Sequence, residues 1–138
     1  TIALAAFIPV IMGMGGNIGT QSSTMIVRGL ATGRVSIENS VKILFKEIRV
    51  GLLLGILYGL LLGLFAIFRF IDVSPMIGVV VGLSIFISMI IAATIGSLVP
   101  LILNRFEIDP AIATGPFVTT AIDILGVAFY FIVAGAFL

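Results

Sequence analysis

Residues 50–68 read VGLLLGILYGLLLGLFAIF, a run of 19 residues without a charged side chain. A helix rises about 1.5 Å per residue, so about 20 apolar residues cross the hydrocarbon core of a bilayer, which is about 30 Å thick. The run is too long and too uniformly apolar for a strand of a membrane barrel, in which polar residues alternate over about 10 positions. It therefore predicts a transmembrane helix.

Similar stretches occur on both sides of this run. They predict three further spans, at about 4–29, 76–102 and 111–137. We therefore expect an all-α, polytopic transmembrane helix bundle with four long spans. Of the 138 residues, 61% are hydrophobic and 9% are charged, whereas about 25% of the residues in a soluble domain are charged. This composition excludes a soluble enzyme, a disordered tail and a nucleic-acid-binding protein, and it predicts a multi-pass protein whose surroundings are the lipid bilayer.

The basic residues indicate how the spans are oriented. The connection at 28–49 carries five Lys and Arg side chains, whereas the break at 69–75 carries one. Positively charged residues are retained on the cytoplasmic side of a membrane. We therefore expect residues 30–49 and 104–109 to lie inside the cell and residues 69–75 to lie outside.

Residues 36–49 have a pattern of their own, with apolar residues at helical spacing on one face and charged residues on the other. Ser36 can cap such a helix at its start. The pattern predicts an interfacial helix that leads into the span at 50–68. We expect a connector here rather than a gate or a docking site for a regulatory domain.

Small residues recur every four positions inside two of the spans. The span at 50–68 contains Gly51, Gly55, Gly59 and Gly63, and the next span contains the pairs Gly78 and Gly82, then Ser84 and Ser88. Small residues on one stripe of a membrane helix let the backbone of another helix approach closely. The stripes therefore predict tight packing and indicate no particular function.

Asp123 is the most informative residue, because it is the only charged residue between Pro110 and Leu138. It lies about 20 Å into the predicted helix, where an ionised carboxylate costs at least about 3 kcal/mol unless it faces water, a cation or a partner. No Lys or Arg lies at a comparable depth in any predicted span. A protonated carboxyl, a wet cavity and a bound cation all remain open, as does a neutral, purely structural Asp123 hydrogen-bonded between helices.

Small and polar residues accompany Asp123 along the last span. The positions that share its predicted helix face are Ala111, Gly115 and Thr119. Pro116 lacks an N–H, so we expect the carbonyl of Ile112 to lose its helical partner. A free carbonyl, a hydroxyl and a carboxylate on one face are oxygen ligands that suit a hard cation.

The first span repeats this arrangement. Gly13, Asn17 and Gln21 follow one another at four-residue spacing, and Gly16 lies beside them. Such a face is a poor partner for lipid and must face protein or water. We expect the helix to unwind over Gly13–Gly19, which would expose further carbonyl oxygens.

Together the two faces predict an oxygen-lined path with one acid per chain. Two copies of the chain across a symmetry axis would supply two carboxylates, which match the charge of a divalent cation. Mg²⁺ gives up its water reluctantly and is typically held by one or two carboxylates plus retained waters, so a sparse site favours hydrated Mg²⁺. The chain has no cysteine and no histidine, which excludes a zinc or iron site built on them.

Three segments carry a resemblance to a known family: PVIMGMGGNIGTQ at 9–21, DPA at 109–111 and GPFVTTAID at 115–123. They closely resemble the transmembrane domain of the MgtE family of magnesium channels, and solute carrier family 41 shares the general pattern. The resemblance covers essentially the whole chain. It implies a homodimer with a central pore, five helices per subunit and a bacterial plasma membrane as the location.

Only four spans are evident, so we expect residues 1–138 to be a fragment of the pore domain. The family's first helix and its cytosolic amino-terminal and CBS regulatory domains would then be missing.

The resemblance also implies a role for six residues. Asp123 would be the acid at the central magnesium site, and Thr119 would contribute a main-chain carbonyl. Asn17 and the backbone of Gly13 and Gly16 would lie on the other pore-lining helix. Asp109 would lie at the cytoplasmic mouth, where it would help to bind ions that govern closure.

The predicted function is Mg²⁺ transport through a dimeric channel selective for divalent cations, with no enzymatic activity. Two alternatives remain open. The first is a proton- or sodium-coupled secondary transporter of a small solute, in which Asp123 is the proton or ion site and Gly13–Gly19 binds the solute. The second is a helix bundle that assembles without transporting anything.

Overall fold

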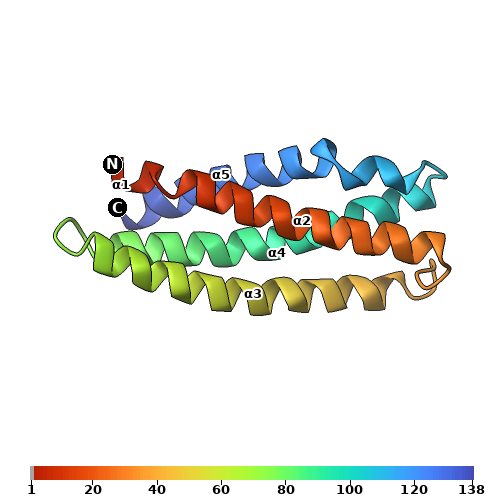
Figure 1. Ribbon diagram of the computed structural model, residues 1–138, viewed down its shortest axis with the longest axis horizontal. Coiled ribbons are helices and arrows are strands. Elements are labelled where there is room, and N and C mark those ends of the chain that lie inside the picture. The colour runs from red at the N-terminus through yellow and green to blue at the C-terminus, as the bar shows by residue number, and fades with distance from the viewer. Residues whose placement is uncertain (1) are drawn as a thin grey trace.

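The computed structural model describes residues 2–138. Its helices, in chain order, are α1 (Ile2–Ala5), α2 (Ile8–Ala31), α3 (Ser40–Arg69), α4 (Met76–Arg105), the 3₁₀ helix η1 (Pro110–Thr114) and α5 (Pro116–Phe137). No strand occurs in this part of the chain. The four long helices lie side by side along one axis, and both chain ends lie at the same end of the bundle (Figure 1).

The prediction of an all-α membrane bundle is confirmed. Within the described residues, four helical segments are long and apolar enough to cross a membrane: Ile2–Ala31, Ser40–Arg69, Met76–Arg105 and Pro116–Phe137. Many large apolar side chains of α3 and α5 point outward. They can face lipid at no cost, because hydrocarbon tails are as apolar as leucine.

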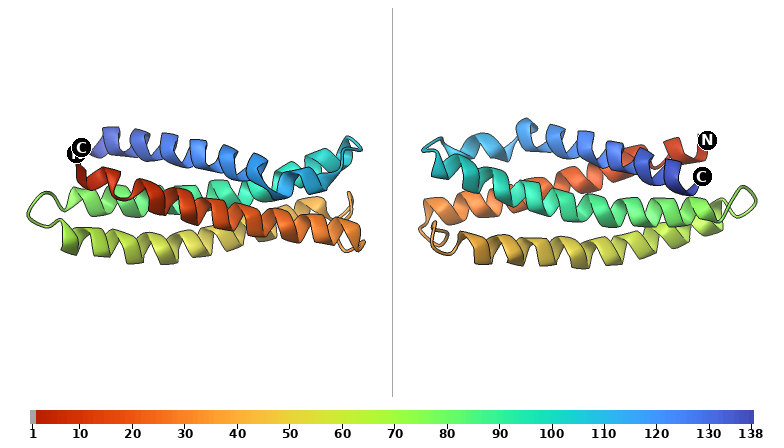
Figure 2. Two further views of the ribbon diagram at one scale, coloured as in Figure 1. Left: turned by 45° about the horizontal axis from the view of Figure 1, so that its top comes forward. Right: turned by 180° about the vertical axis from the view of Figure 1, so that it is seen from behind.

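Helix α4 forms the centre of the bundle. It packs against α2, α3 and α5, and it buries more residues than any other helix. Its side chains Val81, Ile85 and Met89 join Ile11 of α2 and Tyr130 of α5 in the main apolar core. Helices α3 and α5 lie on opposite sides of this core in all three views (Figures 1 and 2).

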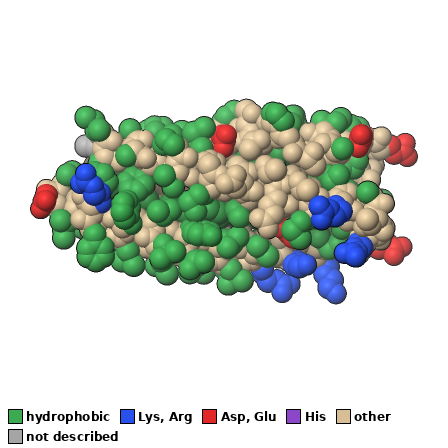
Figure 3. Space-filling model, viewed as in Figure 1, with side chains coloured by type: hydrophobic (Ala, Val, Ile, Leu, Met, Phe, Trp, Pro, Cys, Tyr) green, Lys and Arg blue, Asp and Glu red, His purple; other side chains and the backbone are tan. Residues whose placement is uncertain are grey.

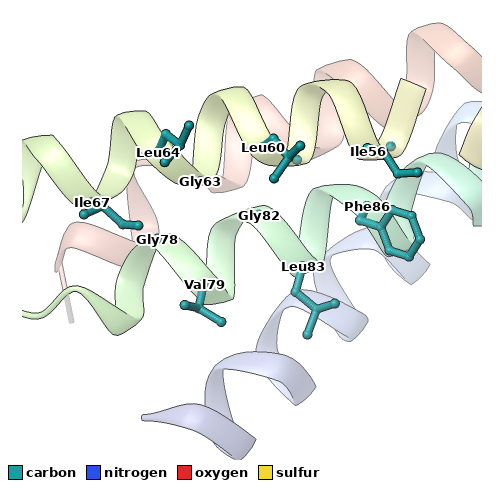
Figure 4. Close-up of a pocket in the computed structure, with 12 residues that line it drawn as sticks. Ile56, Leu60, Gly63, Leu64, Ile67, Gly78, Val79, Gly82, Leu83 and Phe86 are labelled. Carbon is teal, nitrogen blue, oxygen red and sulfur yellow. The ribbon is translucent and has the colours of Figure 1, made fainter. Parts of the chain in front are cut away.

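The glycines of α3 face α4, as their spacing predicts. A methyl group on Gly59 would lie 2.8 Å from the carbonyl oxygen of Gly82, and one on Gly55 would lie 2.9 Å from that of Phe86. The two backbones therefore meet directly, without side chains between them. Apolar side chains such as Leu60 and Leu83 rise on either side of this seam and form a shallow groove (Figure 4).

The prediction of a separate interfacial helix at 36–49 is wrong. Helix α3 begins at Ser40 and runs without interruption to Arg69, because neither a proline nor a turn residue separates the amphipathic stretch from the apolar run. Its 30 residues are about 45 Å long, so its first turns extend beyond the hydrocarbon core. Ser36 does not cap the helix. Its N–H donates instead to Oδ1 of Asn39 at 2.7 Å.

The last span also differs from the prediction. Residues 110–114 form η1, Gly115 is extended (φ −133°, ψ −144°), and α5 begins only at Pro116. The residue before a proline is disfavoured in the α region, and proline itself is favoured in the first turn of a helix. Ala111 therefore does not share a helix face with Asp123, and Pro116 removes no hydrogen bond from a helix interior.

Charge is distributed unevenly between the two ends of the bundle. Most Lys and Arg side chains in Figure 3 gather at the end where α2 stops and α3 starts. This is the end that the sequence assigns to the cytoplasm. The orientation itself stays a prediction.

Candidate ion-binding site

Asp123 lies where α5 passes α2, two turns after the start of α5. The residue as a whole is half-buried, and its Oδ1 atom is fully buried without a hydrogen-bond partner. A carboxylate oxygen in such surroundings is costly unless something binds it. Because the residue as a whole is partly exposed, a cation or the water shell of a cation can balance the charge of this carboxylate.

Gly16 of α2 lets this helix pack closely against the carboxylate. A methyl group on Gly16 would lie 3.6 Å from Oδ1 of Asp123 and 3.0 Å from Cγ2 of Thr119. A side chain at this position would therefore press on Thr119 and occupy the space beside the carboxylate. The structure thus brings Gly16, Thr119 and Asp123 together.

Thr119 is half-buried one turn before Asp123. Its hydroxyl donates to the carbonyl oxygen of Gly115 at 2.9 Å and so stabilises the loosely bonded start of α5. The hydroxyl proton is used in this bond, but the lone pairs of Oγ1 are not. Thr119 can therefore offer oxygen to a passing ion or to its water.

Gly13 and Asn17 lie on the exposed side of α2, next to this contact. A methyl group on Gly13 would meet nothing within 4 Å. The expected unwinding over Gly13–Gly19 does not occur, because α2 is helical from Ile8 to Ala31 and retains its backbone hydrogen bonds. These residues can therefore offer an amide side chain and open space, but no unwound segment of carbonyl groups.

Asp109 is not part of the same cluster. It precedes η1, and its Oδ1 accepts a hydrogen bond from the N–H of Ala111 at 3.0 Å. The whole of η1 and about 10 Å of helical rise in α5 separate it from Asp123. The structure therefore places Asp109 at the end of the bundle, where α4 finishes.

The exposed surface of α2 beside the contact is small and polar. It includes Gly13, Asn17, Gln21 and Thr24. On α5 the exposed Thr120 is accompanied by the exposed apolar side chains of Phe117 and Ile124. A broad tan area over this part of the molecule in Figure 3 separates the green apolar side chains from the charged end. Because lipid cannot satisfy polar groups, this face of α2 suits a protein partner or water.

One chain cannot surround a cation with several acids. Across residues 2–138, no three side chains among Asp, Glu, His and Cys come close enough to hold a metal ion. Asp123 is the one acid that the structure brings to the contact between α2 and α5.

Two further polar residues, Ser88 and Glu47, are buried in the structure. From the sequence, Ser88 was predicted only to allow close packing, and Glu47 was predicted only to be a charged residue of the connection before the span at 50–68. Ser88 of α4 has an unpartnered Oγ atom, which lies 2.9 Å from where a methyl group on Gly15 would be and 3.2 Å from one on Gly126. Glu47 of α3 is buried and accepts a hydrogen bond from Ser22 of α2 at 3.0 Å. In the sequence, the four-residue spacing of Glu47 from Gly51 indicates that Glu47 lies on the same buried stripe as the glycines.

Comparison with known proteins identifies the family of this chain. The sequence model of the MgtE family, described as a divalent cation transporter, matches residues 8–133. The chain belongs to the MgtE family. It is therefore an integral, multi-pass membrane protein, and the resemblance seen in its glycine-rich and Asp123 segments is confirmed.

Curated MgtE relatives match nearly all of this chain. The magnesium transporter MgtE of Bacillus subtilis is 37% identical over 137 residues, which cover 99% of this chain and 30% of the relative. That of Thermus thermophilus is 39% identical over 132 residues, which cover 96% and 29%. That of Enterococcus faecalis is 34% identical over 135 residues, which cover 98% and 29%. The chain thus spans about three-tenths of the length of these relatives.

Proposed function

We propose that this chain carries Mg²⁺ across a membrane as the pore domain of a homodimer, with Asp123 as the acid that selects the ion. The observation that carries the proposal is the buried, unpartnered Oδ1 of Asp123 beside the small, polar face of α2. The relatives described as magnesium transporters support the choice of ion.

A dimer follows from the charge of the ion. One chain offers one carboxylate at this level, and a second copy facing it supplies the other, so that two negative charges balance one Mg²⁺. Mg²⁺ keeps most of its waters in such a site, and these waters reach the oxygens around it. Binding through water is weak enough to let the ion leave, which conduction requires.

The other residues shape the path. Gly16 lets α2 pack closely beside the Asp123 carboxylate, and Thr119 supplies oxygen one helical turn away. Asn17 and the bare backbone at Gly13 line the neighbouring stretch of α2. Asp109 binds ions at the cytoplasmic mouth with the oxygen that does not cap η1.

The proposal also includes the domains that lie outside this chain. Because the chain matches only about three-tenths of its relatives, further domains accompany it in the full-length protein, and we propose that they are cytosolic and regulate the pore. The membrane is the bacterial plasma membrane.

Ion flux into proteoliposomes tests the proposal. Asp123→Ala removes the carboxylate and abolishes Mg²⁺ uptake, whereas Asp123→Asn retains the fold and conducts with poor selectivity. The control is Asp72→Asn, which changes an exposed acid outside the spans and leaves uptake unchanged. Undiminished Mg²⁺ uptake by Asp123→Ala, or solute uptake that follows a pH gradient and ignores Mg²⁺, contradicts the proposal.

A further inference from the structure

Glu47 interrupts a simple pattern on α3. The other buried positions of this helix are Gly51, Gly55, Gly59, Gly63 and Ala66, all without a long side chain. Glu47 precedes Gly51 by one turn on the same stripe, yet it carries a carboxylate that is only 4% exposed. At the one position where the stripe has a long side chain, that side chain is acidic.

This side chain links α3 to a helix other than its main packing partner. Helix α3 packs along α4, but Oε2 of Glu47 accepts a hydrogen bond from Oγ of Ser22 on α2 at 3.0 Å. It is the only hydrogen bond between two side chains among residues 2–138. Burying a carboxylate between membrane helices is unfavourable, so a glycine or alanine would complete the stripe at a lower cost.

Helix α2 has few other polar contacts that fix its rotation about its own axis. It packs against α4 and α5 through the glycines Gly15, Gly16 and Gly19 and through buried apolar side chains such as Ile11. One other side-chain hydrogen bond in the described chain joins residues that are far apart in the sequence. The hydroxyl of Tyr130 donates to the carbonyl oxygen of Leu4 at 2.7 Å, and Leu4 belongs to α1 and not to α2. Within α2 the bond from Glu47 to Ser22 is thus the one side-chain hydrogen bond from another helix.

Ser22 is close to the residues that would line the ion path. It lies between one and two turns along α2 from Gly16 and Asn17. Because α2 is a single uninterrupted helix, a rotation at Ser22 is transmitted to these residues. A change in the rotation of α2 at Ser22 would therefore change which of its groups face Asp123 of α5.

We infer that Glu47 is a positioning residue for the ion path. Its hydrogen bond to Ser22 fixes the orientation of α2 about its own axis. The inference rests on the proposed function in so far as α2 lines that path. Neither residue touches the ion.

Two readouts test the inference, one of which needs no transport. The 138 residues contain no cysteine, so Asn17→Cys places a single thiol on the exposed side of α2, and Thr120→Cys provides the matched control on α5. The rate at which a water-soluble thiol reagent labels each cysteine reports the rotation of its helix. The concentration of Mg²⁺ that gives half-maximal flux reports the path itself.

The expected results follow from the loss of one hydrogen bond. Ser22→Ala and Glu47→Ala each change the labelling rate at Asn17→Cys by about threefold to tenfold, the range typical of a hydrogen bond between membrane helices, and shift the half-maximal Mg²⁺ concentration. Labelling at Thr120→Cys stays the same. Glu47→Gln keeps an acceptor oxygen and behaves like the natural protein. The double variant is no worse than either single variant, because both remove the same bond.

Four results would overturn the inference. They are unchanged labelling at Asn17→Cys in both alanine variants, Glu47→Gln behaving like Glu47→Ala, additive effects in the double variant, and lower thermal stability without any change in labelling. Ser22→Ala keeps the test decisive if Glu47→Ala does not fold. If the natural protein fails to carry Mg²⁺, the proposed function fails, while the labelling arm still decides whether Glu47 positions α2.

Discussion

Two helix contacts in this molecule use the same device for different purposes. Along the seam between α3 and α4, Gly59 approaches the carbonyl oxygen of Gly82 and Gly55 approaches that of Phe86. At the contact of α2 with α4 and α5, Gly15 approaches the hydroxyl of Ser88 and Gly16 approaches the carboxylate of Asp123. The first contact joins backbone to backbone. The second contact also contains a backbone approach, between Gly19 and Gly96, but it adds polar side chains beside Gly15 and Gly16.

The difference teaches that a glycine stripe has no function of its own. In both contacts the glycines let helices come close, as they do in membrane proteins generally. In the α3–α4 seam the space gained is used for packing, and the flanking side chains are all apolar. In the α2–α5 contact the space lies beside an acid, and the neighbouring surface of α2 is polar. A structural seam and a candidate ion path therefore differ in the groups that the glycines contact, and not in the glycines themselves.

Substitution in the α3–α4 seam should have the largest effect on stability. Gly59→Leu inserts a side chain where even a methyl group would lie 2.8 Å from the carbonyl oxygen of Gly82. We expect a loss of about 3 kcal/mol in unfolding free energy, typical of severe overpacking, measured by denaturant unfolding in detergent. Mg²⁺ flux per folded molecule stays the same, because the seam lies outside the α2–α5 contact.

The matched control for the seam is Leu60→Val, the exposed neighbour on α3. It should change the unfolding free energy by less than about 0.5 kcal/mol. Equal losses for the two variants would mean that the seam is not the tight contact described here.

Substitution at the α2–α5 contact should reverse this pattern. Gly16→Ala places a methyl group 3.0 Å from Thr119 and 3.6 Å from Oδ1 of Asp123. We expect Mg²⁺ flux into proteoliposomes to fall about tenfold, equivalent to about 1.4 kcal/mol, with little change in thermal stability. The methyl group presses on Thr119 and so displaces the part of α5 that carries Asp123.

Gly135→Ala, near the end of α5, is the control for this contact, because a methyl group there meets nothing within 4 Å and the residue lies outside the proposed ion path. It should leave flux within about twofold of the natural protein, since no barrier is added. If both variants lower the flux to the same extent, the contact of Gly16 with Thr119 and Asp123 does not determine the flux.

Removal of the Ser88 hydroxyl should have the smallest effect of these substitutions on the unfolding free energy. Buried hydroxyls without a partner cost about 1 kcal/mol or more, and Ser88 Oγ has none. Ser88→Ala should therefore raise the unfolding free energy by about 1 kcal/mol and leave Mg²⁺ flux unchanged. Ser97→Ala is the control. Its hydroxyl donates to the carbonyl of Ala93 at 2.7 Å, so its removal should give no gain. A stability loss in Ser88→Ala would contradict the description of Ser88 as unpartnered.

The sequence was sufficient to predict those features that depend on one helix at a time. The four spans follow from apolar length, the glycine seam from four-residue spacing, and the prominence of Asp123 from its depth in an apolar run. Each of these is a local property. None requires knowledge of which helix lies opposite.

Features that depend on continuity or on a partner were missed. Helix α3 absorbs the predicted interfacial helix, because amphipathic and apolar stretches join without a break when no turn residue intervenes. The late start of α5 depends on the conformation of Gly115 before Pro116. The burial of Glu47 depends on Ser22, which is 25 residues away on another helix. Spacing within one helix cannot reveal such a partner.

The most direct test of the central claim is a density map of the protein in a lipid bilayer with Mg²⁺, at a resolution that reveals ordered water. We predict one Mg²⁺ with an octahedral shell of waters on a two-fold axis, between the Asp123 carboxylates of two protomers. Carboxylates that turn away from the axis, each bound only within its own protomer and with no metal between them, would contradict the account.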